Sequence, residues 1–545
     1  MATAANPAVK QDGISREETK VIFASSLGTV FEWYDFYLYA TLAPFFAALF
    51  FPPGNQTAAL LSAFATYAAG FLIRPFGALV FGRVGDLVGR KYTFLVTILV
   101  MGFSTFAVGL LPTFASVGWL APILLVSLRL LQGLALGGEY GGAATYVAEH
   151  AAPGKRGYDT SWIQTTATLG FFLSLLVIGI CRFGGVMTPA QFAEWGWRIP
   201  FLVSLLLLIF SVYIRLRLNE SPVFQRMKAE GKGSKAPLTD SFLRYPNNKY
   251  VLLALLGATA GQGVVWYTGQ FYALFFLTIT LKVDGQTAYT LIAISLLLGT
   301  PFFIFFGWLS DKIGRLKIIL AGCLIAALTY FPLFQALTHY VNPALEKFQQ
   351  ANAVTVQARE CNFHIFVGPW SKFTDCDRAK DFLTKAGLSF TSTELPAGTP
   401  ESVIVKIGDT ELRGWDQAKF NDALKAKGFP ASADKNAINW GMTLLILFVM
   451  LIYVTMVYGP IAAFLVEMFP TKIRYTSMSL PYHIGNGWFG GMLPLLATAL
   501  VAAKGDIYYG LWYPIVVALM TFVVGLLFLK DRRDLDLHAD ESLYT

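Results

Sequence analysis

Twelve long apolar runs dominate the sequence and decide what kind of fold it can adopt. A helix needs about 20 apolar residues to cross the roughly 30 Å hydrocarbon layer of a bilayer. Only 14% of the residues are charged, against about 25% in soluble domains. The sequence therefore predicts an all-α membrane protein and argues against a soluble enzyme, a nucleic-acid binder or a disordered scaffold. The runs cover residues 21–50, 58–82, 93–111, 119–147, 158–182, 198–217, 250–281, 286–309, 317–338, 441–467, 476–503 and 508–529.

Basic residues collect in the short connections on one side of the predicted membrane, which is the mark of the cytoplasmic side. The connections at 51–57 and 112–118 on the other side carry no charge. We therefore expect both termini to be cytoplasmic. The first run starts near Val21 without a small-residue cleavage site, which favours a retained span over a signal peptide. The basic residues on the cytoplasmic side are Arg83, Arg90, Lys91, Lys155, Arg156, Arg215, Arg217, Arg226, Lys228, Lys232, Lys235, Lys312, Arg315, Lys317, Lys472, Arg474, Lys530, Arg532 and Arg533.

An internal repeat divides the chain into two halves. The motif at 82–90 recurs 225 residues later at 307–315, and the motif at 149–156 recurs 318 residues later at 467–474. The difference, 318 − 225 = 93, places an insertion in the second half, in the polar stretch 339–440. Two related six-helix halves are typical of secondary transporters. The predicted organisation is a tail (1–20), an N-terminal bundle (21–217), a linker (218–249), a C-terminal bundle (250–338 and 441–530), an extracytoplasmic α/β insertion (339–440) and a tail (531–545).

We interpret the repeated motifs as gates at the cytoplasmic side. An aspartate such as Asp86 can accept hydrogen bonds from the exposed N–H groups at the start of another helix. The acidic and basic residues of the second motif pair can bridge the two halves when the inside is shut. The predicted gating residues are Gly82, Asp86, Gly89, Arg90, Glu149, Arg156, Asp311, Gly314, Arg315, Glu467 and Arg474.

The insertion has the pattern of a small folded domain. Its charges balance, with twelve Lys plus Arg and twelve Asp plus Glu between positions 340 and 440. Residues 362–367 and 402–407 are typical of strands, 376–386 of a helix capped by Asp375, and 415–427 of an amphipathic helix. This order resembles glutaredoxin, with Cys376 at the second active-site cysteine and Thr399-Pro400 at the cis-proline. Phe373 stands where the nucleophilic cysteine belongs, so the resemblance implies a module without thiol catalysis.

The four cysteines form no CxxC pair, which argues against a zinc site and a disulfide scaffold. Cys361 and Cys376 are candidates for a disulfide in an oxidising compartment. In the glutaredoxin-like arrangement they lie at opposite ends of the first strand, too far apart to bridge. Both possibilities stay open at this stage.

Further stretches in both halves resemble one transporter family. They resemble the metabolite:proton symporters of the major facilitator superfamily, the group that holds α-ketoglutarate, shikimate, citrate and proline/betaine permeases. The resemblance implies a monomer with a twelve-helix major facilitator fold in a bacterial inner membrane. It also implies no enzymatic activity, and the proton as coupling ion without another cofactor. The stretches are Gly28-Thr-Val-Phe-Glu32-Trp-Tyr-Asp35-Phe, Arg74-Pro-Phe-Gly, Arg129-Leu-Leu-Gln-Gly133, Gly137-Gly-Glu139-Tyr-Gly-Gly, Trp195-Gly-Trp-Arg-Ile-Pro-Phe201, Asn219-Glu-Ser-Pro-Val-Phe224, Glu467-Met-Phe-Pro-Thr and Tyr482-His-Ile-Gly-Asn-Gly.

Five ionisable residues fall within the predicted spans: Glu32, Asp35, Arg74, Arg129 and Glu139. Each is a functional candidate, because a charge in lipid costs several kcal/mol. Three carboxylates against two guanidiniums leave one negative charge, and burial favours the protonated form of a carboxyl group. We assign the coupling proton to Asp35, with Arg129 as the partner it releases and with Glu32 and Glu139 beside them. Arg74 is the candidate for a substrate carboxylate. The alternative is a set of permanent salt bridges that only hold helices together.

The second half offers polar and aromatic residues to shape the site, with no charged residue inside its predicted spans apart from His483 if it is protonated. Each of them has helix packing as its alternative role. The candidates are Gln262, Trp266, Tyr267, Gln270, Tyr453, Tyr458, His483 and Asn486.

The predicted function is proton-driven import of a small carboxylate, such as a dicarboxylate, an α-keto acid or a shikimate-like acid. The predicted partners are that substrate, the proton and the lipid bilayer, with no nucleic acid. A proline/betaine symporter is the alternative within transport, although its cation would favour an aromatic cage. A membrane sensor or redox-linked protein that uses the outer domain is the alternative from another class.

Overall fold

The computed structural model describes residues 16–51, 66, 69–152, 154–183, 186–362, 372–535 and 537. Several predictions fall partly outside these residues. They are most of both tails, the connection 52–57, the start of the second span, and the strand expected at 362–367 beyond its first residue.

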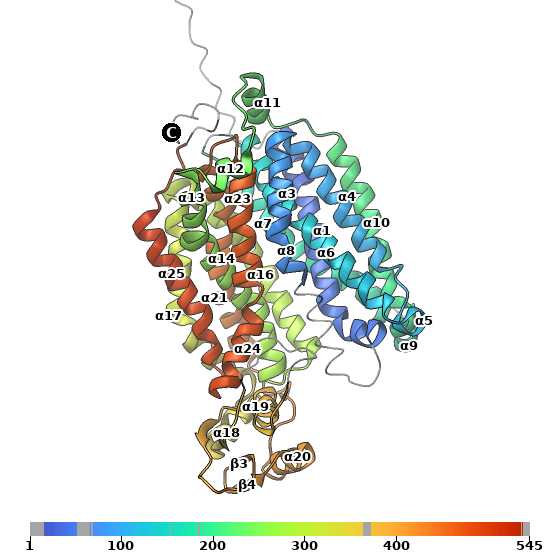
Figure 1. Cartoon of the computed structure of the whole chain (residues 1–545), viewed down its shortest axis with the longest axis vertical. Coiled ribbons are helices and arrows are strands. Elements are labelled where there is room, and N and C mark those ends of the chain that lie inside the picture. Colours follow the sequence, from blue (N-terminus) through green and yellow to red (C-terminus); the bar gives the residue numbers. More distant parts are fainter. Residues whose placement is uncertain are drawn as a thin grey trace, which may run out of the picture.

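Two bundles of helices stand side by side, one from each half of the chain (Figure 1). The N-terminal bundle contains α1 (Arg16–Phe50), α3 (Arg74–Leu87), α4 (Arg90–Val108), α5 (Phe114–Val117), α6 (Leu120–His150), α7 (Arg156–Gln164), α8 (Thr166–Phe183), α9 (Pro189–Glu194), η1 (Gly196–Arg198) and α10 (Ile199–Leu216). The linker holds α11 (Pro222–Ala229) and α12 (Pro237–Phe242).

The C-terminal bundle is interrupted by wide π-helical turns in its first and fifth helices. π-turns occur frequently at functional sites. The bundle contains α13 (Asn247–Ala254), η2 (Leu255–Thr259), α14 (Ala260–Tyr267), η3 (Thr268–Tyr272), α15 (Ala273–Phe275), η4 (Phe276–Thr280), α16 (Gly285–Ile313), α17 (Arg315–Val341), α21 (Trp440–Tyr458), α22 (Ile461–Met468), α23 (Arg474–His483), η5 (Ile484–Gly490), α24 (Leu493–Lys504), η6 (Tyr509–Leu511) and α25 (Trp512–Phe528). The π-helical elements are η2, η3, η4 and η5.

Ten helical stretches in the described part of the chain are long and apolar enough to cross a membrane. α1 and α3, which cover the first predicted span and the end of the second, are not among these ten. Leu206 on α10 and Leu328 on α17 are each 68% exposed on the outside of the bundles. Such side chains are favourable in lipid, so the composition of the outer surface agrees with a multi-pass membrane protein.

Glycines let α3 and α6 touch backbone to backbone. A Cβ atom on Gly133 would meet the carbonyl oxygen of Gly70, and one on Gly137 would meet the carbonyl oxygen of Arg74. Small residues at such positions allow this close approach between membrane helices. The contact fixes the start of α3, and with it Arg74, against the middle of α6.

The insertion is a four-stranded sheet with helices, in line with the α/β domain that its strand and helix patterns predicted. Its elements are α18 (Pro343–Ala351), β1 (Val354–Ala358), α19 (Asp375–Lys385), β2 (Thr391–Glu394), β3 (Val403–Ile407), β4 (Thr410–Arg413) and α20 (Gln417–Ala426). The strand order is β2-β1-β3-β4. β1 and β2 are parallel, whereas β3 runs antiparallel to both β1 and β4. The strand expected at 402–407 and the helix expected at 415–427 correspond to β3 and α20.

Two details of the predicted insertion are wrong, and one strand was not predicted. The unpredicted strand is β1 at Val354–Ala358, whereas the strand expected at 362–367 lies outside the described residues beyond its first residue. Thr374, and not Asp375, caps α19 by accepting a hydrogen bond from the Asp377 N–H group. The Thr399–Pro400 bond is not cis; the cis peptide bond among the described residues joins Tyr245 to Pro246.

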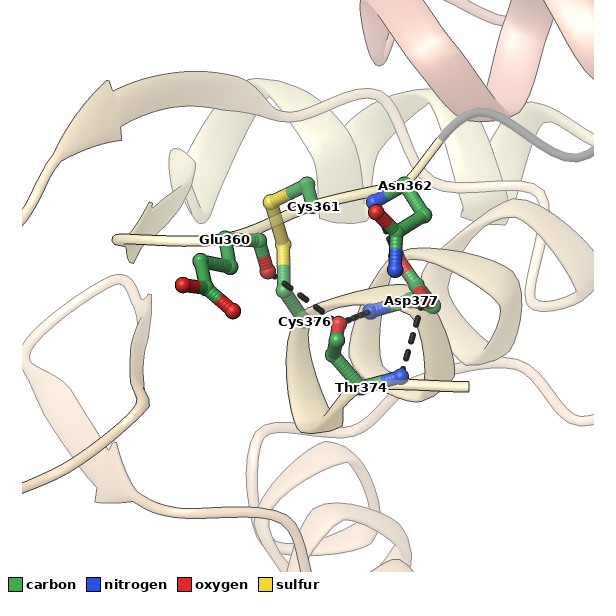
Figure 2. Close-up of a disulfide and its surroundings, with 6 residues drawn as sticks. All are labelled: Glu360, Cys361, Asn362, Thr374, Cys376 and Asp377. Atoms are coloured by element: carbon green, nitrogen blue, oxygen red, sulfur yellow. Dashed lines mark hydrogen bonds between the residues drawn. A yellow bond between two sulfur atoms is a disulfide. The ribbon is translucent and has the colours of Figure 1, made fainter. Parts of the chain in front are cut away.

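Cys361 and Cys376 form a disulfide with a Cα–Cα distance of 5.4 Å (Figure 2). The expectation that they lie too far apart is wrong, because β1 ends before Cys361 and this cysteine therefore approaches the first turn of α19. Around the bridge, Thr374 donates to the Glu360 carbonyl oxygen, and the Asp377 carboxylate accepts from the N–H groups of Asn362 and Thr374. The disulfide thus ties the end of β1 to the start of α19.

The insertion docks on the end of the C-terminal bundle that lies opposite α11 and α12 (Figure 1). Backbone hydrogen bonds join it to three separate connections of that bundle. Phe390 donates to Gly505 at 2.6 Å, Ala433 donates to Lys282 at 2.9 Å, and Asn439 donates to Tyr340 at 2.9 Å. Because these bonds reach several loops of one bundle, we expect the insertion and the C-terminal bundle to move as one body.

Candidate functional site

An ion pair and one amide hydrogen bond hold Asp35 in the middle of α1. Arg129 of α6 donates to Asp35 at 2.8 Å, and Gln132 donates to the other carboxylate oxygen at 3.1 Å. Gln132 also accepts from Arg129 at 2.7 Å and donates to Thr105 of α4 at 2.8 Å. The Arg129 guanidinium lies 4.1 Å from the centre of the Tyr39 ring. Asp35 therefore has both oxygens occupied, and Gln132 is a member of the cluster that the sequence analysis did not assign.

A looser ion pair lies one turn earlier on α1. Arg74, at the start of α3, donates to Glu32 at 3.3 Å, and its guanidinium lies 4.4 Å from the centre of the Phe71 ring. The two side chains are 11% and 9% exposed, more than the side chains of the other ion pairs inside the N-terminal bundle. Within the described residues, Arg74 Nε has no hydrogen-bond partner although it is buried. The pair thus leaves guanidinium donors available to another anion.

Glu139 belongs to a third ion pair that the sequence analysis missed. Its carboxylate is hydrogen-bonded by both Arg215 at the end of α10 and Thr97 of α4, the latter at 2.7 Å. Arg215 is 1% exposed, and it also donates to the Phe94 carbonyl oxygen. Arg215 lies in the last turn of α10, among the basic residues predicted for the cytoplasmic side, but its side chain is buried in the bundle. The count of three carboxylates against two guanidiniums is therefore wrong: three carboxylates face three guanidiniums.

The predicted residues of the C-terminal bundle separate into three groups. Gln262 and Asn486 satisfy each other through two amide hydrogen bonds of 3.0 and 2.8 Å, which hold α14 against η5. Tyr453 accepts from Thr329 of α17 at 3.0 Å, so it lies between α17 and α21 and away from the ion pairs of α1. The third group, Trp266, Tyr267, Gln270 and His483, is buried and lies near α1 or α3. Tyr458, the last predicted residue, is buried beside Tyr482.

Aromatic rings connect the two bundles around these residues. Trp33 of α1 stacks on Trp266 of α14 with ring centres 4.8 Å apart, and Phe36 packs edge-on against Phe271 of η3 at 4.7 Å. Tyr37 donates to Gln270 at 3.4 Å. Aromatic pairs of this kind add about 0.5–1.5 kcal/mol each beyond their burial. They join the bundles by contacts that carry no net charge.

Four buried nitrogen atoms in this region have no hydrogen-bond partner in the part of the chain that the structure describes. They are Arg74 Nε, Trp266 Nε1, Gln270 Nε2 and His483 Nε2. Arg74, Trp266 and Gln270 present N–H donors there, and an unpaired buried donor is costly. The arrangement therefore suits an incoming acceptor such as a carboxylate.

Three tyrosines extend the region along the interface between the bundles. Tyr140 of α6 stacks on Tyr482 of α23 with ring centres 3.7 Å apart, and the hydroxyl groups of Tyr458 and Tyr482 lie 3.0 Å apart. Gln164 of α7 donates to the Tyr140 hydroxyl at 2.8 Å. The sequence motifs contain Tyr140 and Tyr482, but nothing in their spacing showed that they meet.

The residues of one predicted gate join the two bundles at the end of the molecule opposite the insertion. Asp86 of α3 accepts from the N–H groups of Tyr475 and Thr476 at the start of α23, at 3.3 and 2.8 Å. Arg90 donates to Asp86 at 2.8 Å, and Glu149 pairs with Arg474 at 2.7 Å. All four charged side chains are at most 2% exposed.

The second gate repeats this arrangement with the roles of the halves exchanged. Asp311 of α16 accepts from the N–H groups of Gly157 and Tyr158 at the start of α7, at 2.9 and 2.8 Å. Arg315 donates to Asp311 at 2.8 Å, and Glu467 pairs with both Arg315 and Arg156. Gly82, Gly89 and Gly314 supply the close approaches: a Cβ atom on Gly82 would meet Thr476, and the two others have positive φ angles.

Two further acids cap helices at these gates and were not predicted. Glu220 accepts from the Lys91 N–H group at the start of α4, at 3.1 Å, and Asp531 accepts from the Leu316 N–H group at the start of α17, at 3.0 Å. The repeat places the two capped helices, α4 and α17, at equivalent positions in the two halves, which indicated that they share a capping contact. The two acids could not be found from the repeat because they lie outside the repeated motifs.

Comparisons with known proteins agree with this geometry. The model of the sugar (and other) transporter family matches residues 20–244. The shikimate transporter of Escherichia coli (strain K12) is 36% identical over 333 residues, which cover 58% of this chain and 72% of the relative. The chain belongs to this transporter family of the major facilitator superfamily. It is therefore a transporter and not an enzyme.

Other members of the superfamily place the chain among metabolite transporters. The alpha-ketoglutarate permease of E. coli is 34% identical, covering 60% of this chain and 74% of the relative. An inner membrane metabolite transport protein of the same organism is 41% identical, over 49% of this chain and 58% of the relative. The solved structure of a proton:xylose symporter bound to 6-bromo-6-deoxy-D-glucose has a TM-score of 0.60 at 14% identity, covering 98% of this chain and 100% of that one. At that identity, the structural match shows the fold alone.

Proposed function

We propose that the chain is a proton-coupled symporter that imports a small carboxylate by alternating access between its two bundles. The observation that carries the proposal is the loosely paired Arg74 guanidinium, whose buried Nε has no hydrogen-bond partner among the described residues. A guanidinium binds carboxylate through charge-assisted hydrogen bonds, often two at once. Relatives at 34–36% identity are named for shikimate and alpha-ketoglutarate, both of which carry carboxylates.

The matched charges of the N-terminal bundle give the coupling a physical reason. Three carboxylates and three guanidiniums form a neutral set. A substrate carboxylate that binds Arg74 adds one negative charge to this low-dielectric region and competes with Glu32 for the guanidinium. Taking up one proton restores neutrality, and an unpaired carboxylate in a buried site favours its protonated form.

We propose Glu32 as the acid that takes this proton, in place of the Asp35 that the sequence favoured. The Glu32–Arg74 contact is a single bond of 3.3 Å, whereas Asp35 is held at both oxygens by Arg129 and Gln132. Displacing Glu32 therefore breaks fewer bonds than displacing Asp35. Asp35, Arg129 and Glu139 then act by fixing α1, α4, α6 and α10 around the site.

The two gates supply the alternating access. Both motif clusters join the two bundles, which supports a closed gate, and we place them at the cytoplasmic side because of the basic residues in the connections there. Both termini are then cytoplasmic, the twelve spans follow, and the insertion lies outside. The Cys361–Cys376 disulfide supports this orientation, because disulfides persist in oxidising compartments. The protein is proposed to act as a monomer in the inner membrane of a bacterium.

The test is uptake of labelled shikimate, α-ketoglutarate and succinate by proteoliposomes, with and without an inward pH gradient. We expect gradient-driven accumulation of at least one acid. Glu32→Gln should abolish accumulation while exchange of internal for external substrate continues, because the proton site is lost but the gates still move. Asp35→Asn, the matched variant one turn away, distinguishes a coupling proton on Glu32 from one on Asp35.

If Asp35→Asn alone loses accumulation and keeps exchange, the proton binds at Asp35 and the assignment to Glu32 is wrong. If the wild-type protein equilibrates a carboxylate but never accumulates it under a gradient, symport itself is excluded. Binding without any transport would favour a sensor.

A further inference from the structure

One carboxyl group at the second gate is buried without a partner. Asp159 lies in the first turns of α7 and is 2% exposed. Neither of its carboxylate oxygens accepts a hydrogen bond from any residue that the structure describes. Buried ionised carboxylates are nearly always paired, because leaving one unpaired costs several kcal/mol. The gate argued above does not use this residue.

Acidic residues outnumber basic ones among the described groups that interact with Asp159. Glu18 of α1 and Asp311 of α16 are acidic, and Lys155, just before α7, is basic. Among the other acids of the helices packed on α7, Glu467 of α22 is held by Arg156 and Arg315. Glu149 near the end of α6 is held by Arg90 and Arg474.

Asp311 approaches Asp159 only because the gate is closed. It caps α7 through the N–H groups of Gly157 and Tyr158, and Tyr158 directly precedes Asp159 in the chain. Asp311 comes from the C-terminal bundle, so opening the gate separates the two carboxyl groups. The environment of Asp159 therefore differs between the closed and open states.

The other gate provides an internal comparison. The offset of 318 residues that relates Arg156 to Arg474 relates Asp159 to Ser477. Asp86 caps α23 as Asp311 caps α7, but Ser477 is neutral and donates to Ser241 at 2.8 Å. The two gates thus share their caps and ion pairs and differ in one extra carboxyl group. Helix capping does not require an acid at this position, since the equivalent position works with serine.

We propose that Asp159 is a proton-binding site that makes closure of the second gate depend on the pH of the solution the gate faces. The gate closes with Asp159 protonated, because the neutral group is buried beside Asp311 and Glu18 at low cost. When Asp159 loses its proton, the buried charge favours the open gate. Acid therefore closes the gate and base opens it.

This inference rests on the alternating access proposed above, but it is independent of the coupling proton. Asp159 takes and returns its proton on the same side of the membrane, so it moves no proton across. A single linked proton changes the ratio of open to closed gates by at most about tenfold per pH unit.

The experiment follows the gate directly in purified protein reconstituted in nanodiscs. Double electron–electron resonance between two spin labels reports the distance between the bundles. The labels are attached at Tyr92→Cys on α4 and Ile313→Cys on α16, which are both exposed positions at the gated end. Between about pH 5 and pH 8, we expect the open fraction of wild type to rise with pH. Asp159→Asn and Asp159→Ser should hold it low at every pH.

The control is Glu18→Gln, which removes a neighbouring acid and keeps Asp159. It should retain the pH dependence with a shifted midpoint. A pH dependence that survives in Asp159→Asn overturns the proposal, and so does an open fraction in wild type that does not change with pH. Failure of symport would instead appear as lost accumulation in proteoliposomes with this pH dependence intact.

Discussion

The Glu139–Arg215 pair offers a decisive test between a structural and a coupling role for an acid within the membrane. Both side chains are at most 1% exposed. Glu139→Gln keeps an oxygen that can accept from Thr97 but leaves the Arg215 guanidinium without a counterion, held by the Phe94 carbonyl oxygen and the Phe94 ring. Breaking a buried pair from one side costs about 3–5 kcal/mol. We expect Glu139→Gln to destabilise the protein by this amount.

The double variant Glu139→Gln/Arg215→Met should recover most of that stability, because it leaves no uncompensated charge. Gly28→Ala is a third perturbation of the same pair that changes no charge: its Cβ atom would overlap both Glu139 and Arg215. It should therefore also destabilise the protein. The measurements are unfolding of the purified protein in detergent and the rates of exchange and gradient-driven uptake per folded molecule.

We predict that every folded variant of the Glu139–Arg215 pair keeps gradient-driven accumulation of the substrate. A Glu139→Gln protein that is as stable as wild type but exchanges substrate without accumulating it would refute the structural assignment. Glu139 would then be a coupling acid, as the sequence analysis suggested.

Three further predictions concern the gates, the helix contact and the site. Asp86→Asn should slow the maximal transport rate with little change in KM, because it weakens the cap on α23 and not the substrate site; an unchanged rate in transport kinetics would contradict the gate. Gly137→Ala should lower the yield of folded protein in size-exclusion chromatography, because its Cβ atom would meet the Arg74 carbonyl oxygen. The control Gly179→Ala has open space around its Cβ atom and should leave the yield unchanged. Trp266→Phe keeps an aromatic ring but removes the unpaired N–H group. The KM for the carboxylate should therefore rise about tenfold or more, as expected for the loss of a hydrogen bond to a charged group. Equal KM values in the variant and the wild type would show that Trp266 does not bind the substrate.

Some contacts of the repeated motifs follow from the sequence because their information is local. Asp86 and Arg90 are four residues apart, as are Asp311 and Arg315, and each pair forms a 2.8 Å contact on its own helix. The repeat then implies that both halves do the same thing. Even so, the two capping acids from outside the repeat became visible only in three dimensions.

The charge count failed for a specific geometric reason. Arg215 lies in the last turn of α10, among basic residues that mark the cytoplasmic side. Side chains on a helix point back toward its N-terminus, which for Arg215 is into the bundle and toward Glu139. A buried acid without a visible partner is therefore a reason to search the ends of neighbouring helices for a base.

The insertion shows the limit of short patterns. The sequence analysis did not recognise β1 at Val354–Ala358, because a five-residue strand carries too little periodicity to stand out. Without β1, Cys361 was placed too far from Cys376, although the two form a disulfide. The alternation of strand and helix patterns, by contrast, indicated a folded α/β domain because that conclusion depends on no exact register.

The division of chemistry between the bundles suggests how substrate drives the change of state. The three ion pairs all lie in the N-terminal bundle, whereas Trp266 and Gln270 of the C-terminal bundle offer neutral N–H donors. A substrate bound to Arg74 on one side and to these donors on the other contacts both bundles only when they are close together. A ligand shifts an equilibrium by its difference in affinity for the two states. Compounds that bind Arg74 but cannot reach the C-terminal donors should therefore occupy the site without promoting closure, and act as competitive inhibitors in uptake assays.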